Sequence, residues 1–204
     1  YQISNPPHSL RNEIKFLSKN KDVALGSLFA LGYIEIFHER LNNSIYYDSL
    51  DLKGYYENLN GYKDRVKYRA RFYGNLDEQN VAFEKKIKKG SVNRKDVSFS
   101  KMSNTDWTQS TFPQEGNLKP IVHLKYRRRY FWDPVNRIRC TVDWALESKS
   151  YLGHFWLKHS KIIVEFKSDT SHNEFKVPHH FSLNTRFSKY AYCVSEHRLP
   201  AEHY

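Results

Sequence analysis

The sequence predicts an α+β fold in which antiparallel strands close into a barrel with a charged interior. Four cations occupy alternate positions from Arg65 to Arg71, and apolar residues separate them. Successive side chains of a strand point to opposite faces, so the four cations share one face, where their mutual repulsion favours an anionic partner. The same alternation of ionic and apolar residues recurs in at least five segments. With the ionic faces turned inward, these strands would surround a charged tunnel, and helices would cover the apolar exterior.

Alternating side chains define the expected strands. Glu13 and Lys15, for example, share the ionic face of the first run. A turn of sequence Asp-Pro-Val-Asn at residues 133–136 separates two later runs, which are predicted to form a hairpin. The expected strands cover residues 10–17, 43–47, 65–72, 81–88, 121–132, 137–143 and 162–167.

Helices are expected between and after these strands. Residues 22–31 carry apolar side chains at helical spacing and predict a short helix. Asp48 is placed to cap the turn or helix that follows it. Residues 104–114 are expected to form a helix or a loop. Residues 179–192 are expected to form a helix that is entered after a proline, a residue that suits the first helical turn.

Length and composition favour one domain spanning residues 1–204. The 39% hydrophobic and 16% aromatic content argues against disorder. The formal net charge of +11 points to phosphate-bearing partners or an acidic surface. Two cysteines are too few for a disulfide framework, so the expected location is the cytoplasm or the cytosolic face of a membrane.

Membrane contact is not expected from this segment itself, because no stretch is apolar enough for a membrane span. The chain begins with Tyr1 rather than Met. We therefore expect a piece of a longer protein, which could be tethered to a membrane through flanks that are missing here.

Several short motifs occur in the order typical of one known family. They are E-I-K-F from Glu13, S-I-Y-Y-D from Ser44, R-V-K-Y-R-A-R-F-Y-G from Arg65, F-E-K-K-I-K from Phe83, Y-R-R-R-Y from Tyr126, R-I-R-C-T-V-D from Arg137, V-E-F-K from Val164 and F-S-K-Y from Phe187. Together they span nearly the whole chain. The chain thus resembles the VTC domain, the polyphosphate polymerase of the vacuolar transporter chaperone complex and its bacterial relatives.

This resemblance implies a fold and an activity. The VTC domain is one of the CYTH-like triphosphate tunnel metalloenzymes, which implies an eight-stranded antiparallel closed tunnel barrel with a charged lumen, covered by a few helices. It implies transfer of the ATP γ-phosphate to a growing inorganic polyphosphate chain that threads through the tunnel. A divalent metal is implied as cofactor, Mn²⁺ first and Mg²⁺ as the alternative. ATP, polyphosphate, and pyrophosphate or phosphate are therefore the expected partners.

The resemblance also assigns roles to individual residues. Lys15, Arg69 and Arg71 match nucleotide-phosphate contacts, for which guanidinium groups suit phosphate oxygens. Glu165 matches the metal-binding carboxylate, a role that Glu84 or Glu13 could share.

The expected site combines these matches with the parity of the strands. In the run of three arginines at residues 127–129, the middle one is chosen because the flanking tyrosines share its parity. The expected catalytic residues are Lys15, Arg69, Arg71, Arg128, Arg139 and Glu165. The expected phosphate-binding residues are Lys15, Arg65, Lys67, Arg69, Arg71, Lys86, Arg128, Arg139, Lys167 and Lys189.

Other functions remain open beside the polymerase. Related tunnel triphosphatases carry an E-x-E-x-K strand, but Arg11 stands here in place of the first glutamate. Fewer carboxylates and more cations favour retaining a polyanionic product, so a triphosphatase is the second candidate. A non-catalytic module that binds polyphosphate or pyrophosphate is the third. Nucleic acid is not expected, because its binders present cations and aromatic residues on an open face, whereas these cations alternate with residues fit for burial.

Overall fold

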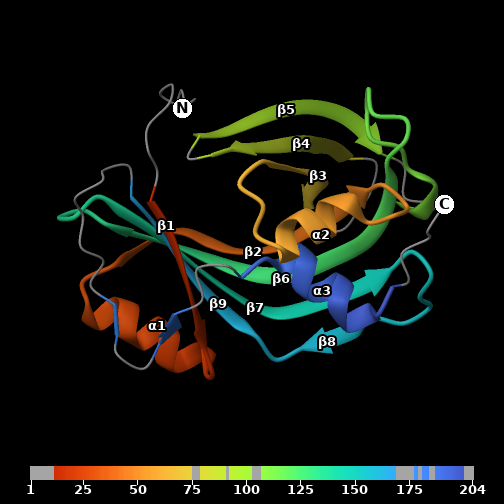
Figure 1. Cartoon of the computed structure of the whole chain (residues 1–204). Coiled ribbons are helices and arrows are strands. Elements are labelled where there is room, and N and C mark those ends of the chain that lie inside the picture. The colour runs from red at the N-terminus through yellow and green to blue at the C-terminus, as the bar shows by residue number, and fades with distance from the viewer. Residues whose placement is uncertain are drawn as a thin grey trace.

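One antiparallel sheet of ten strands dominates the computed structural model, which describes residues 12–74, 79–90, 92–102, 107–168, 177–178, 181–183 and 187–199 (Figure 1). Its strands are β1 (Asn12–Ser18), β2 (Ile34–Asp48), β3 (Arg65–Tyr73), β4 (Gln79–Lys89), β5 (Val92–Met102), β6 (Lys119–Asp133), β7 (Ile138–Ser150), β8 (Leu157–His159), β9 (Ile162–Ser168) and β10 (Ser182–Leu183). The helices are α1 (Lys21–Ala30), α2 (Lys53–Leu59), α3 (Lys189–His197) and a 3₁₀ helix, η1 (Trp107–Gln109). The predicted antiparallel α+β fold is confirmed.

The sheet curls but does not close. Its strands follow the order β10-β1-β9-β7-β6-β2-β3-β4-β5, and β8 pairs with β7 outside that path. Within the described ranges β5 pairs only with β4, and β10 has two residues, so the two outer edges do not meet by backbone pairing. The prediction of a closed eight-stranded barrel is therefore wrong. The curl still brings β4 near β1, since Lys86 Nζ lies 3.9 Å from Glu13 Oε2.

Two strands differ from the predicted pattern because backbone pairing, not burial, holds them. β2 begins at Ile34 rather than at residue 43, and its exposed N-terminal half pairs with β6 from Ile34 opposite Trp132 onward. The sequence pattern does not indicate β5, whose side chains are exposed at nearly every position. All eleven of its residues pair with β4. A strand with little burial leaves little hydrophobic periodicity in the sequence.

The C-terminal helix is shorter than predicted. α3 begins at Lys189 after Ser188, whose side chain accepts a hydrogen bond from Ala191 N at 3.4 Å as an N-cap. A helix from residue 179 is wrong, because residues 182–183 pair with β1 as strand β10. Residues 179–180 and 184–186 of the predicted helix lie outside the described ranges.

Local capping signals place the other helices as predicted. At the start of α1 the side chain of Asn20 accepts hydrogen bonds from the second and third residues that follow it. Asp48 caps the first turn of α2, because its carboxylate accepts from Gly54 N at 2.9 Å and Tyr55 N at 2.8 Å. It also accepts from Tyr190 Oη at 2.5 Å, which ties α2 to α3. Of the segment predicted as helix or loop, residues 107–109 form η1.

The convex face of the sheet carries two apolar clusters. Ala24, Leu25 and Leu28 of α1 pack against β1, β7 and β9, so α1 covers the exterior as predicted. Over β2 to β5 the cover is the segment at residues 107–118, with Phe112 and Leu118 buried. Among the described residues, no helix is both long and apolar enough to cross a membrane.

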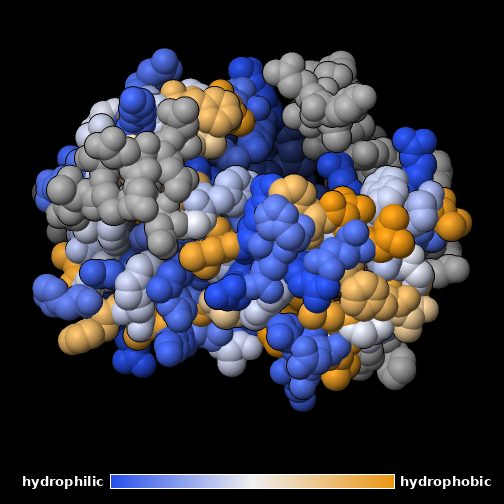
Figure 2. All heavy atoms as spheres, turned by 180° about the vertical axis from the view of Figure 1, so that it is seen from behind, coloured by the Kyte–Doolittle hydropathy of each residue, from blue (hydrophilic) through white to orange (hydrophobic). Residues whose placement is uncertain are grey.

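The concave face, defined here as the side that carries the alternate cations of β3, is divided. One end is apolar, because Tyr190, Cys193 and Val194 of α3 pack there against Leu124 and Ile163. The other end, called the charged half below, holds the ionic residues. The predicted interior, ionic along its whole length, is therefore wrong, because only one end of the concave face is ionic. Seen from behind, the surface shows a recess bordered by hydrophilic residues (Figure 2).

Candidate functional site

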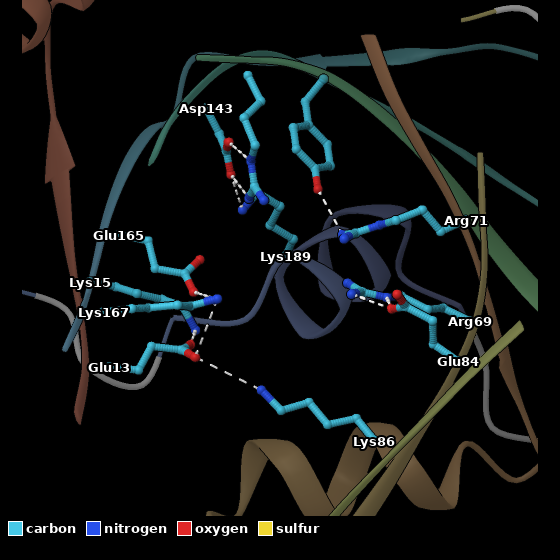
Figure 3. Close-up of polar contacts among 12 residues, drawn as sticks. Glu13, Lys15, Arg69, Arg71, Glu84, Lys86, Asp143, Glu165, Lys167 and Lys189 are labelled. Carbon is cyan, nitrogen blue, oxygen red and sulfur yellow. Dashed lines mark hydrogen bonds and ion pairs between the residues drawn. The ribbon is translucent and has the colours of Figure 1, made fainter. Parts of the chain in front are cut away.

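The charged half gathers ionic side chains, most of which Figure 3 draws, from β1, β3, β4, β5, β6, β7, β9 and α3 around one space. Strand register sets them opposite one another, since Arg69 pairs with Glu84 on β4, and Lys15 on β1 pairs with Glu165 on β9. A register slip of one residue would turn a whole row outward. The labelled side chains that point into the space are Glu13, Lys15, Arg69, Arg71, Glu84, Lys86, Asp143, Glu165, Lys167 and Lys189.

Arg69 is held in place by Glu84. Arg69 Nε donates to Glu84 Oε2 at 2.5 Å and its Nη1 to Tyr46 Oη at 3.4 Å, while Lys95 Nζ lies 2.6 Å from Glu84 Oε1. Burial alone would raise the pKa of Glu84, but Arg69, Arg71 and Lys95 lower it to about 2. Glu84 is therefore an ionised carboxylate that orients Arg69, and it is a poor proton acceptor at neutral pH.

Arg71 keeps a donor unused. Its Nη2 donates to Tyr126 Oη at 3.2 Å, but its buried Nε has no hydrogen-bond partner among the described residues. Ser44, which pairs with Arg71 on β2, has a buried hydroxyl in the same condition. Buried polar groups in native proteins nearly always have partners. The unpaired guanidinium N–H therefore marks a place that a ligand or a water molecule completes.

Asp143 holds two cations in place. Arg128 Nε donates to Asp143 Oδ1 at 2.5 Å, Arg128 Nη2 to Oδ2 at 2.8 Å, and Lys189 Nζ lies 2.5 Å from Oδ2. Burial would raise the pKa of this fully buried carboxylate, but Arg128 and Lys189 outweigh burial and lower it. Lys189 thus links the first turn of α3 to β7 and β6. These two parallel hydrogen bonds fix the Arg128 guanidinium group and occupy the edge formed by its Nε and Nη2 atoms.

A second ionic cluster forms where β1 and β9 pair. Lys15 Nζ lies 2.7 Å from Glu13 Oε1, and Lys167 Nζ lies 2.7 Å from Glu165 Oε1 and 3.8 Å from Glu13 Oε2. Burial would raise the pKa of Glu165, but Lys167, Lys15 and more distant cations hold it well below its usual range. The pKa of Glu13 is also lowered, because the same lysines and Lys86 outweigh its burial and the nearby Glu165.

Glu13 and Glu165 are the carboxylates that fit a divalent metal best. Both are ionised, both point into the charged half, and they share Lys167 as a cation neighbour. Hard cations such as Mn²⁺ and Mg²⁺ use oxygen ligands, commonly one or two protein carboxylates together with phosphate oxygens. Glu84 fits less well, because Arg69 and Lys95 occupy its two oxygens. The described residues contain no cluster of three or more His, Cys, Asp or Glu side chains.

Lys67 differs from the other lysines of the site in having neutral partners. Its Nζ donates to Asn58 Oδ1 at 3.1 Å and Ser188 Oγ at 3.0 Å, on α2 and before α3. Burial lowers the pKa of Lys67 well below its usual range, and nearby cations, Lys15 and Arg65 first among them, lower it further. The charged form of Lys67 therefore has no carboxylate partner among these contacts, and its surroundings favour the neutral amine.

The remaining predicted residues lie at the margins. Arg65 donates from Nη1 to the carbonyl oxygen of Tyr62 at 2.6 Å. Arg139 is exposed on β7, in register with Lys167. Of the three consecutive arginines, the middle one lies on the concave face, whereas Arg127 pairs with Glu39 outside it.

Sequence reasoning assigned no role to three residues of the site. Tyr126 Oη accepts from Arg71, Asp143 positions two cations, and Lys95 pairs with Glu84. A signal existed for Asp143, which shares parity with Arg139 in its motif. Lys95 lies on the unpredicted strand β5, so its parity gave no information.

Part of the chain is similar to a known family. Residues 9–101 match the VTC domain family, which confirms the resemblance over that range. The motifs after residue 101 lie outside the match. None of the curated proteins compared with the chain matches it.

Solved structures show a similar fold. A candidate adenylyl cyclase from Hippeastrum, described as having a dominant triphosphatase activity, has a TM-score of 0.51 and 14% identity, covering 94% of this chain and 99% of its own. A candidate adenylate cyclase from Vibrio parahaemolyticus has a TM-score of 0.48 and 16% identity, covering 93% of this chain and 83% of its own. At such identities the Hippeastrum protein shows a shared fold and nothing further.

Proposed function

We propose, from the VTC-domain match of residues 9–101, that the protein is a polyphosphate polymerase that transfers the ATP γ-phosphate to a growing inorganic polyphosphate chain. The observation that supports this is the excess of cations over carboxylates on the charged half. Its carboxylates are Glu13, Glu84, Asp143 and Glu165. The cations around them are Lys15, Lys67, Arg69, Arg71, Lys86, Lys95, Arg128, Lys167 and Lys189. The charge that remains suits a polyanion.

Arg69 and Arg71 are suited to hold the triphosphate, because both guanidinium groups are fixed and Arg71 Nε is still unpaired. Phosphoryl transfer depends mainly on positioning and on charge neutralisation, both of which fixed cations supply. Lys15 and Lys189 extend this cationic wall from β1 and α3.

The protonation states of the carboxylates favour transfer to phosphate over hydrolysis. A terminal phosphate oxygen of polyphosphate is already ionised and needs no base, whereas water does. The pKa values of Glu13, Glu84, Asp143 and Glu165 are all lowered, so these groups are weak bases. A site with such carboxylates positions an anionic acceptor better than it activates water.

Glu13 and Glu165 would hold the divalent metal, Mn²⁺ first and Mg²⁺ as the alternative. When bound, such an ion neutralises charge on phosphate oxygens. Lys167, which contacts both carboxylates, would then be free to turn toward phosphate.

A triphosphatase is the second candidate, supported by the activity described for the Hippeastrum protein of similar fold. Incubation with ATP and Mn²⁺, followed by gel analysis of the products, separates the candidates. Long polyphosphate chains are the expected result. ADP with only free phosphate would favour the triphosphatase, and intact ATP with retained polyphosphate binding would leave a non-catalytic binding module.

Polyphosphate binding is expected to take up protons at Lys67. Burial and nearby cations lower the pKa of Lys67 in the free protein, and a bound polyanion would raise it, so the complex holds more protons than the free protein. Affinity should therefore fall as the pH rises from the lowered pKa toward the raised one. Calorimetric titrations in buffers of different ionisation enthalpy measure this uptake, which Lys67→Met should reduce while binding persists. Binding enthalpies that are independent of the buffer would contradict the assignment.

A further inference from the structure

Phe99 on β5 is an exposed aromatic side chain on the concave face. Its residue partner on β4 is Ala82, two positions from Glu84. The ion pair between Lys95 and Glu84 shows that this side of β5 faces the charged half, and Phe99 shares the parity of Lys95. Although it faces inward, 73% of Phe99 is exposed. β5 is the outermost strand at the open edge of the sheet (Figure 1).

The register puts Phe99 in one row with Arg71. Phe99 pairs with Ala82, Ala82 pairs with Arg71, and Arg71 pairs with Ser44. Neighbouring strands are about 4.8 Å apart, so Phe99 and Arg71 are separated by roughly 10 Å across the sheet. Ala82, whose side chain is a single methyl group, is the residue between them in this row of the described strands. Along this row lie an exposed aromatic ring, then the small side chain of Ala82, and then the Arg71 guanidinium group with its unpaired N–H.

We propose that Phe99 stacks on the nucleobase of the nucleoside triphosphate whose phosphates bind at Arg71 and Arg69. Because it concerns the donor nucleotide, the inference rests on the proposed function. A planar base needs an aromatic face at the rim and a path for ribose and phosphate toward the cations, and the row provides both. Val97, on the same face of β5 and 44% exposed, adds apolar surface beside the ring.

Stacking has a consequence for specificity. Every nucleobase has a π-face, so a stacking platform is tolerant of base identity. Purines, with the larger ring system, should bind more tightly than pyrimidines. ATP and GTP are therefore expected to bind with similar affinity, and both more tightly than UTP.

The test compares a ligand that has a base with one that has none. Affinities for ATP and for inorganic tripolyphosphate are measured for the wild type, Phe99→Ala, Phe99→Trp and Phe155→Ala. Phe155, which is 80% exposed on the connection between β7 and β8, is a control of the same residue type and exposure. Phe99→Ala should weaken ATP binding about 10-fold and leave tripolyphosphate binding unchanged. Phe99→Trp should retain ATP binding, and Phe155→Ala should match the wild type.

Other outcomes have distinct meanings. Equal losses for ATP and tripolyphosphate in Phe99→Ala, or no loss for ATP, would overturn the stacking assignment and leave the proposed function intact. A wild-type protein that binds neither ligand would overturn the proposed function, and the base subsite with it.

Discussion

Replacing Arg69 by alanine should lower polyphosphate synthesis at least about 100-fold, because the proposed function makes Arg69 a fixed donor to the triphosphate. The fold should survive, since Glu84 keeps its ion pair with Lys95 at 2.6 Å. Initial rates with ATP and Mn²⁺ measure the loss, and the urea midpoint of unfolding measures the fold.

Arg127 provides the matched control. It is also an arginine in a strand and has a carboxylate partner, Glu39, but it lies outside the concave face. Arg127→Ala should keep near wild-type synthesis. An unfolded Arg69→Ala protein would show that Arg69 is structural. Equal losses of synthesis in the two variants would contradict the assignment of the reaction to the concave face.

Replacing Asp143 by alanine should destabilise the protein by about 3–5 kcal/mol, because two buried cations lose their shared counter-ion. Asp143 is fully buried, and Arg128 and Lys189 are its partners. Removal of one member of a buried ion cluster is costly chiefly through the charges left unpaired. The free energy of unfolding in urea is the measurement.

Two further variants separate lost charge from lost packing. Asp96→Ala removes a partly exposed aspartate that pairs with Arg94 on β5, and should change stability by about 1 kcal/mol or less. Combining Asp143→Ala with Arg128→Met and Lys189→Met removes the unpaired cations and should recover part of the stability. If Asp143→Ala costs no more than Asp96→Ala, the ion cluster does not support the fold.

The parts of the fold that could be predicted are those whose pattern reflects burial. The hairpin of β6 and β7 keeps one apolar face against the core, so its periodicity appears in the sequence. β5 and the first half of β2 are held by backbone pairing with exposed side chains, and left no such pattern. The start of α3 was misplaced because residues 182–183 pair with β1, a tertiary contact that local sequence does not encode.

More of the site than of the sheet's outer edges could be predicted from the sequence. Parity put Arg69 and Arg71 on one face, and the family resemblance together with the parity of the flanking tyrosines added Arg128, where the structure has them. Parity cannot show which carboxylate pairs with which cation, since that depends on register between distant strands, as for Arg128 and Asp143. Nor can it show whether a sheet closes, because closure depends on partners for its two outer edges.

A crystal structure of the protein grown with inorganic tripolyphosphate and Mn²⁺ tests most directly whether the charged half binds polyanions. We predict phosphate oxygens within hydrogen-bond distance of Arg69 and Arg71, with Nε of Arg71 newly paired and further phosphates reaching Lys15 or Lys189. Tripolyphosphate bound on the convex face, with the cations of the charged half still paired only to their carboxylates, would contradict it.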